Sequence, residues 1–256
     1  MKRFAVLALT ILAAAPTEAQ VATADLERFE IAIKRIHDRT LSERHTYALL
    51  KELCTAAPRR LSGSPAAAAA VEWAEQAMTR AGLEKVHLEP CMVPHWVRGD
   101  VETLRFVAPT EAIGEPLPIL ALGGTVATPA GGIVGEVVEI TDLEQITEAV
   151  KGKIVFFNRP FDPTLLSTFK GYSAAGDQRF RGPAKAAAAG AVAAIVRSMT
   201  PNLDEIPHTG GTVTPEGTKA IPAAAVSTLG AERIAAHLAR GVVRLKLELS
   251  CQTLPD

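Results

Sequence analysis

Apolar residues recur three or four positions apart in three stretches near the start of the chain, and this spacing predicts three amphipathic helices. The first helix is expected to begin with Asp25 as its N-cap and the second with Ser42 as its N-cap. The third is expected to begin at Ser64 and Pro65 and to end at Gly82. The apolar positions are Leu26, Phe29, Ile33 and Ile36 in the first helix, Tyr47, Leu50, Leu53 and Cys54 in the second, and Val71, Trp73 and Met78 in the third.

After the third helix the pattern changes to extended and alternating segments. Two extended stretches, 85–97 and 101–108, come first. From about residue 111, apolar runs typical of buried strands alternate with stretches typical of helices, which predicts an α/β fold. Strands are expected at 116–122, 132–140, 153–158, 191–198, 221–228 and 242–250, and helices at 142–150, 182–190 and 229–241.

The first residues have the pattern of an export signal. A positively charged start precedes an apolar run at 4–15, which is shorter than the roughly 20 residues that a membrane span needs. Small residues precede Gln20, and a second small-residue site precedes Asp25. We therefore expect residues 1–19 to be a signal peptide. The protein is then exported, either periplasmic or secreted, with no membrane attachment after the signal is removed.

The charge and the cysteine count narrow the classes of partner and fold. The 256 residues carry a net charge of −1 at neutral pH, so the basic excess of a nucleic-acid-binding protein is absent. Hydrophobic residues make up 48% of the chain and aromatic residues 5%, which favours helix–sheet packing of small and branched aliphatic side chains. Cys54, Cys91 and Cys251 leave two alternatives open in an exported protein: one disulfide with a free thiol, or three free thiols.

The stretch VHLEPCMVPHWVRGD raises the question of a metal site. His87, Cys91 and His95 are four residues apart, and on a helix they would share one face as zinc ligands. Pro90 and Pro94 disfavour a helix, so we expect an extended strand. Residues four apart in a strand are separated by roughly 13 Å, too far to share one ion. A strand with one polar face is therefore the favoured interpretation.

No recognised catalytic motif occurs in the sequence. The stretch LSGSP lacks the second glycine of a nucleophile elbow. The glycine-rich runs GGTVATPAGG and HTGGTVTPEG lack both the lysine of a phosphate loop and the dinucleotide-binding pattern. The sequences His-Glu-x-x-His, His-x-Asp and Asp-Asp-Gly are also absent. The residues themselves therefore nominate neither a catalytic set nor a metal-binding set.

Four longer blocks of sequence carry a family resemblance. They are APRRLSGSPAAAAAVEWAEQAMTRAGLEKVHLEPCMVPHWVRGD, GKIVFFNRPFD, RFRGPAKAAAAGAVAAIVRS and PHTGGTVTPEGTKAIPAAAVST. Together, and in this order, they resemble the secreted zinc exopeptidases related to carboxypeptidase Q. The resemblance implies an incomplete N-terminal part of an aminopeptidase-like α/β domain at 25–108 and an inserted protease-associated domain at 112–250. It further implies a homodimeric metallopeptidase in which two zinc ions and a Glu general base hydrolyse dipeptides or short peptides.

The zinc-binding part of that family has no counterpart in this sequence. The family's first zinc motif, a His-x-Asp, lies beyond the point that LSCQTLPD resembles, and the later ligands and the catalytic Glu lie further on. We therefore expect zinc in the complete family enzyme, and no metal ligand or catalytic residue in this chain. On this hypothesis the chain is an N-terminal portion, or fragment, of an exported zinc-dependent exopeptidase and is inactive alone because those residues lie beyond Asp256. The alternative is a non-catalytic exported module that binds peptides or a protein through its protease-associated domain.

One loop is a candidate for contact with substrate. His208, Thr209 and Gly210 lie in the part that resembles the lid-like domain of the family, where they could touch the end of a bound dipeptide or short peptide. A turn in which His208 hydrogen-bonds locally is the simpler interpretation.

Overall fold

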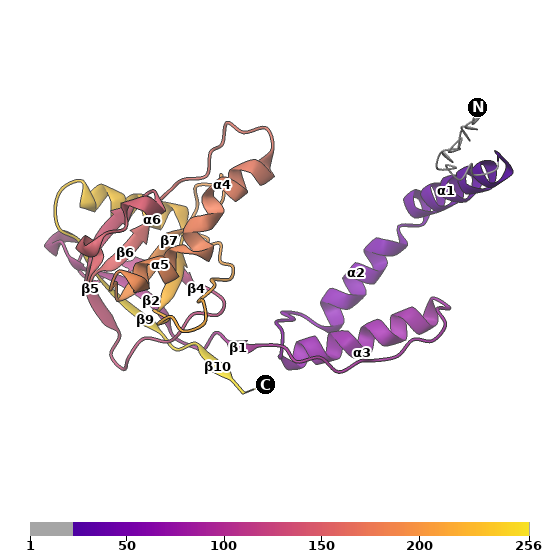
Figure 1. Ribbon diagram of the computed structural model, residues 1–256, viewed down its shortest axis with the longest axis horizontal. Coiled ribbons are helices and arrows are strands. Elements are labelled where there is room, and N and C mark those ends of the chain that lie inside the picture. Colours follow the sequence, from indigo (N-terminus) through magenta and orange to yellow (C-terminus); the bar gives the residue numbers. More distant parts are fainter. Residues whose placement is uncertain (1–22, 256) are drawn as a thin grey trace, which may run out of the picture.

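The chain folds into a helical segment followed by a mixed sheet, in a computed structural model that describes residues 23–255 (Figure 1). The predicted signal peptide at 1–19 lies outside the described residues. A small ribbon of β1 (His95–Val97) and β10 (Gln252–Leu254) lies between the helical segment and the sheet. The predicted α/β class is confirmed.

Three helices form the first segment: α1 (Thr23–Glu43), α2 (His45–Ala56) and α3 (Pro65–Arg80). As predicted, Ser64 caps α3, because its side chain accepts a hydrogen bond of 3.1 Å from the Ala67 N–H. Gly82 follows α3 with a φ of +79°, a conformation that glycine adopts readily. The prediction that Ser42 caps the second helix is wrong, because Ser42 lies inside α1. The break comes at Arg44, whose backbone is in the left-handed region.

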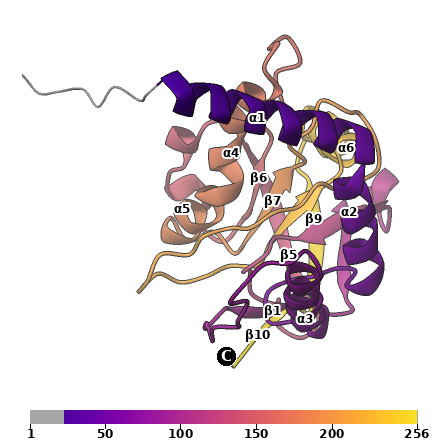
Figure 2. The same cartoon turned by 90° about the vertical axis from the view of Figure 1, so that its right-hand side faces the viewer.

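The apolar faces of these helices are exposed. Phe29 and Ile33 of α1 are 60% and 65% exposed, and Leu50 of α2 is 54% exposed. Neither α2 nor α3 contains a buried residue. Figure 1 shows the three helices standing to one side of the sheet, and in Figure 2, which is viewed from that side, they lie in front of it. None of the described helices combines the length and the apolar character that a membrane crossing requires.

The large sheet consists of eight strands with three helices in the connections. The strands are β2 (Glu102–Ala108), β3 (Pro116–Leu117), β4 (Ile119–Ala121), β5 (Ile133–Ile140), β6 (Ile154–Phe157), β7 (Ala193–Arg197), β8 (Ala223–Val226) and β9 (Arg244–Leu249), and the helices are α4 (Thr168–Phe180), α5 (Gly182–Ala188) and α6 (Thr228–Leu238). Their order in the sheet is β3-β2-β9-β5-β6-β7-β8-β4. Strands β5 to β8 run parallel, whereas β9 and β4 are antiparallel to β5 and β8.

The two outer strands of this sheet are neighbours in sequence. Only Pro118 separates β3, at one edge, from β4, at the other. The Pro118 carbonyl accepts a hydrogen bond of 3.0 Å from the N–H of Ser227, which follows β8. The sheet must therefore curl until its two edges come together. The stretch 116–122, predicted as one strand, supplies both edges.

Alternate residues of the central strand β6 pack on opposite faces of the sheet. Ile154 and Phe156 belong to an apolar cluster that includes Ile234 of α6. Val155 and Phe157 belong to a second cluster, which includes a residue of α5. A strand buried on both faces needs apolar side chains at every position, which is why this stretch reads as an unbroken apolar run.

The stretch 142–150 does not form the predicted α-helix. Asp142 accepts a hydrogen bond of 2.9 Å from the Glu144 N–H, and Thr147 accepts one of 3.3 Å from the Ala149 N–H. These side chains start two separate turns, and Ile146 between them has an extended backbone. Local capping therefore prevails over helix continuation. The two 3₁₀ turns are η2 (Leu143–Gln145) and η3 (Glu148–Val150); a third, η1 (Thr110–Ala112), follows β2.

Two boundaries also differ from the sequence-based expectation. Of the extended stretch 85–97, only β1 pairs with another strand. Strand β2, assigned from the sequence to the first part of the chain, lies inside the large sheet between β3 and β9. Helix α4 and strand β10 form in stretches where the hydrophobic spacing predicted neither a helix nor a strand. Helix α4 buries small residues such as Gly171 and Ala175 rather than an apolar stripe.

Candidate functional site

The candidate loop begins at the carboxyl edge of the parallel strands. The His208 N–H donates a hydrogen bond of 2.8 Å to the hydroxyl of Ser198, which directly follows β7. That hydroxyl in turn donates a bond of 2.7 Å to the carbonyl of Val226, the last residue of β8. In α/β sheets ligands bind at the carboxyl ends of parallel strands, so His208 lies where a ligand site is expected.

From His208 the loop continues along the outer strand β4. The Thr209 hydroxyl donates a hydrogen bond of 2.8 Å to the Ala121 carbonyl. The Gly210 carbonyl accepts one of 2.8 Å from the Gly123 N–H. The structure therefore holds all three candidate residues in one anchored loop. The bonds reach residues distant in the sequence, so the turn with local hydrogen bonding that we expected does not form, and contact with substrate stays a prediction.

A cavity of about 280 Å³ opens beside His208. Helix α4 supplies one wall, and the segments that follow β6 and β7 supply the others. The volume is close to the lower end of the range for small-molecule sites, and it suits one or two amino-acid residues. Phe169, at the start of α4, is 81% exposed beside the cavity. Besides His208, the lining residues are Phe161, Thr168, Phe169, Tyr172, Met199, Thr200 and Pro201.

Two residues of α4 near this cavity were not found from the sequence. Tyr172 lines the cavity, and Arg179 donates a hydrogen bond from Nη2 to the Tyr172 hydroxyl. The two residues are seven positions apart, which places them on one face of a helix. This spacing would have been the signal, but it becomes visible only once α4 is known to be a helix.

Charged side chains at the same edge are held by defined partners. Arg159 after β6 pairs with Asp177 of α4. Arg197 at the end of β7 pairs with Glu232 of α6 at 2.6 Å. The hydroxyl and the N–H of Thr164 bond to Asp162 and lower the pKa of that carboxyl below its usual value. These pairs fix the segments around the cavity.

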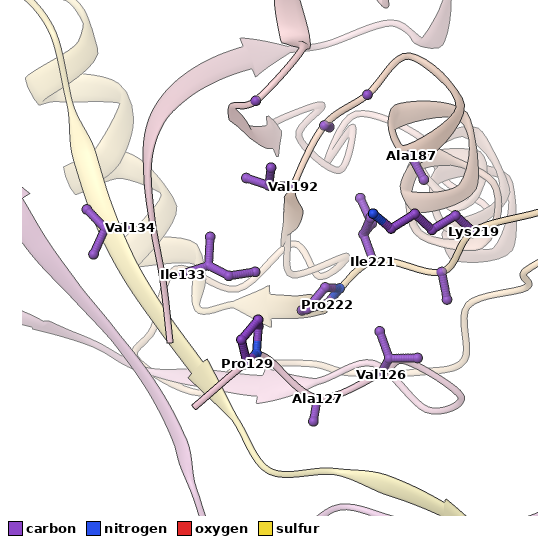
Figure 3. Close-up of a pocket in the computed structure, with 14 residues that line it drawn as sticks. Val126, Ala127, Pro129, Ile133, Val134, Ala187, Val192, Lys219, Ile221 and Pro222 are labelled. Carbon is purple, nitrogen blue, oxygen red and sulfur yellow. The ribbon is translucent and has the colours of Figure 1, made fainter. Parts of the chain in front are cut away.

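A larger cavity of about 590 Å³ lies at the opposite edge of the sheet (Figure 3). Its walls come from residues before β6, β7 and β8, at the amino ends of these strands. Figure 3 shows Val192, Ile133 and Ile221 among the apolar side chains, with the Lys219 amine as the labelled charged group. It offers one cation and no acid–base pair, so it provides less specific chemistry than the His208 cavity.

The histidines and cysteine first considered as zinc ligands do not form a metal site. His87 is occupied by the Lys85 carbonyl at 2.9 Å and by Glu89 at 3.0 Å, contacts that raise its pKa, the backbone bond contributing most. Cys91 and His95 line a third, small cavity of about 200 Å³, separate from the two described above. Within residues 23–255, no three His, Cys, Asp or Glu side chains are grouped as metal ligands. The described residues therefore do not fit the zinc that the resemblance implies for the complete enzyme.

Sequence comparison identifies relatives of known name. The chain is 32% identical to carboxypeptidase Q of Bos taurus and 31% identical to carboxypeptidase Q of Homo sapiens, each over 219 residues. The matched part is 84% of this chain and 44% of each relative, so the chain spans about half the length of the curated relatives it matches. No protein-family model matches the chain.

Solved structures give a consistent result. A peptidase M28 precursor from Shewanella amazonensis has a TM-score of 0.79 and 32% identity, over 86% of this chain and 50% of that chain. An aminopeptidase from Aneurinibacillus has a TM-score of 0.50 and 19% identity, over 81% of this chain and 44% of that chain. The aminopeptidase is similar to this chain in fold alone, whereas the M28 peptidase precursor is similar in both fold and sequence.

Proposed function

We propose that this chain binds a short peptide as its part in peptide hydrolysis. The chain belongs to the carboxypeptidase Q-like group of the M28 peptidases. The observation that carries the proposal is the agreement of sequence and fold with that group over more than four fifths of the chain. The ligand class is a dipeptide or short peptide. The binding place is the His208 cavity, because its size and its position at the carboxyl edge of the sheet suit such a ligand.

Within this proposal the described residues act in binding rather than in bond cleavage. The resemblance implies zinc as the cofactor of the complete enzyme, where it would supply a metal-activated hydroxide. The described residues contain no grouped ligand set for it. We therefore propose that this chain alone hydrolyses no dipeptide. His208 and its neighbours would contact and orient the peptide end.

The proposal also assigns the two parts of the molecule. Residues 25–98 would be opening elements of a peptidase domain. The eight-stranded sheet would be a protease-associated domain that begins with β2 rather than at residue 112, because β2 lies between β3 and β9. Export to the periplasm or beyond, and pairing into a homodimer, remain parts of the proposal that rest on the resemblance.

A second candidate function is a peptide-binding module without catalysis. The observation that favours it is that the described residues by themselves line the His208 cavity. The two candidates share the ligand and differ in whether the bound peptide is later cleaved.

Calorimetric titration with the dipeptide Ala-Phe tests the proposal. We expect saturable binding to the purified chain, and no release of free amino acids when zinc is added. His208→Ala should weaken binding about fivefold, the equivalent of one hydrogen bond. His45→Ala is the matched control, because His45 is exposed at the start of α2. Hydrolysis by the chain alone would overturn the binding-only role. Failure of the wild-type chain to bind would overturn peptide binding itself.

A further inference from the structure

The larger cavity, at the amino ends of β6, β7 and β8, has apolar walls and takes no part in the proposed peptide site. Its volume of about 590 Å³ lies within the range of small-molecule sites. Helix α5 and the start of β7 border it on one side, and the segment 126–134 borders it on another (Figure 3). Val192, Ile133 and Ile221 contribute branched aliphatic side chains. Such walls suit an aliphatic ligand, because they offer apolar contact and few hydrogen bonds.

Part of this apolar lining is in contact with water. Val134 is 45% exposed and Val126 is 39% exposed, and both line the cavity. An alkyl chain laid against them would remove apolar surface of both the protein and the ligand from water. Each methylene group buried in this way strengthens binding about fourfold. The cavity therefore favours a ligand with a long aliphatic part.

Two lysines at this cavity lack a carboxylate partner. Lys219 lines it, and in Figure 3 its side chain extends toward the other lining residues. The stem of Lys151 lies beside the lining residue Gly190, where an added Cβ would come within 3.1 Å of the Lys151 Cγ. None of the described residues that line the cavity is acidic.

Other lysines in this part of the chain are paired with glutamates. These pairs are Lys153 with Glu136 at 2.7 Å, Lys185 with Glu144 at 3.1 Å, and Lys246 with Glu248 at 3.1 Å. Among residues 23–255, Lys219 and Lys151 have no such ion pair. The cavity therefore combines an apolar interior with positive charge that the described residues leave unpaired.

We propose that this cavity binds a molecule with a single alkyl chain and an anionic head group. The chain lies against the apolar walls, and the head group lies beside Lys219 and Lys151. Lysine suits this position, because its methylene stem can lie on apolar surface while its ammonium group stays in water. The ammonium groups attract an anionic head and repel a cationic one. The inference goes beyond the proposed function, because peptide binding beside His208 neither requires this ligand nor excludes it.

Calorimetric titration below the micelle concentration tests the proposal with dodecanoate and close variants of it. We expect saturable binding of dodecanoate at a single site, and about 15-fold weaker binding of decanoate, which is two methylenes shorter. Dodecylammonium has the same chain length and the opposite charge, and it should bind at least about tenfold more weakly than dodecanoate. Dodecyl phosphate separates the possible sources. Tighter binding than dodecanoate would support the proposal with a lipid phosphate as the ligand, and weaker binding would support it with a fatty acid.

Two pairs of substitutions locate the bound molecule, since the exposed faces of α1–α3 could also take up an alkyl chain. Ala187→Trp places a large ring in the cavity and should weaken dodecanoate binding at least about tenfold. Ala188→Trp adds the same ring at the next position, which is exposed and outside the lining, and should leave binding unchanged. Lys219→Gln should weaken dodecanoate about two- to fivefold, as expected for an exposed ion pair. Lys170→Gln is its control, because Lys170 is an exposed lysine on α4.

Three results would overturn the proposal. They are the absence of dodecanoate binding, equal binding of dodecanoate and dodecylammonium, and a dodecanoate affinity that neither Ala187→Trp nor Lys219→Gln changes. The Lys219→Gln comparison decides the matter if Ala187→Trp fails to fold, which thermal unfolding would reveal. Peptide binding beside His208 is measured with a different ligand at the opposite edge of the sheet, so either idea can fail without the other.

Discussion

Helices α1–α3 and the eight-stranded sheet place their apolar residues in opposite environments. Phe29 on α1 is 60% exposed, whereas Phe156 on β6 is completely buried between neighbouring strands and α6. The three helices form, and Ser64 caps α3, whereas the predicted caps Asp25 and Ser42 both lie inside α1. The helices pack against little beyond each other. In the sheet, nearly every apolar side chain of β6, β7 and β8 belongs to one of two clusters.

Hydrophobic spacing therefore specifies a helix or a strand, but it does not specify the surface that buries the apolar face of that element. Helices of these lengths have little stability in water on their own, because nucleation is costly and most helix stability in proteins comes from packing. The apolar faces of α1–α3 therefore need a covering surface that the described residues do not supply. The sheet closes upon itself and needs none.

Limited proteolysis should show the largest contrast. A low concentration of trypsin should digest residues 25–90 quickly and leave a resistant core that contains β2 to β9, because cleavage requires local unfolding and the helices bury almost nothing. Intact-mass analysis of the surviving fragment measures this. Protection of α1–α3 with early cleavage inside the sheet would show that the helices are covered in solution.

Removal of one large side chain from each part should give the next largest difference. Phe156→Ala should lower the free energy of unfolding of the sheet by about 3–5 kcal/mol, because it leaves a cavity in the core. Phe29→Ala should change it by less than about 0.5 kcal/mol, as for other exposed sites. Urea unfolding followed by tryptophan fluorescence of both variants is the measurement. Similar losses for the two variants would contradict the exposure of the α1 face.

Two serines whose side chains cap a described helix, Ser227 and Ser64, allow a smaller, matched comparison. Ser227 accepts a hydrogen bond of 3.0 Å from the Gly230 N–H, donates one of 3.1 Å to Glu205, and is buried. Ser64 accepts one of 3.1 Å from the Ala67 N–H and caps a helix outside the sheet. Ser227→Ala should cost the sheet about 1–2 kcal/mol, and Ser64→Ala should leave its unfolding unchanged while increasing amide exchange in α3. An equal loss of sheet stability in both variants would mean that α3 and the sheet unfold as one unit.

The smallest expected effect is a difference in reactivity between exposed and buried cysteine thiols, which involves no change in stability. The three cysteines are free, with Cys54 and Cys91 exposed and Cys251 buried against the Thr125 carbonyl. Burial raises the pKa of the Cys251 thiol, so less thiolate is present near pH 8 and the thiol is also shielded. Iodoacetamide at that pH should modify Cys54 and Cys91 and spare Cys251 until urea is added. Mass spectrometry of the peptides reads this out, and rapid labelling of Cys251 would contradict its burial.

Local signals were sufficient for much of the fold. The cap at Ser64, the helix end at Gly82 and the unbroken apolar run of β6 each follow from neighbouring residues and occur as predicted. The helix predicted at 142–150 fails for an equally local reason, because Asp142 and Thr147 each begin a separate turn. For the candidate site, the family resemblance suggested His208, which lines a cavity in the structure, and its contact with substrate stays a prediction.

The sequence by itself determined most of the helices and strands, the cap at Ser64 and the helix end at Gly82, because these depend on a few adjacent residues. Only the tertiary structure decided that the stretch around Pro118 supplies both edges of the sheet and that Gly210 lies against Arg179. Such contacts join residues that are distant in the chain. Their partners are chosen by the packing and closure of the whole sheet, which local propensity does not encode.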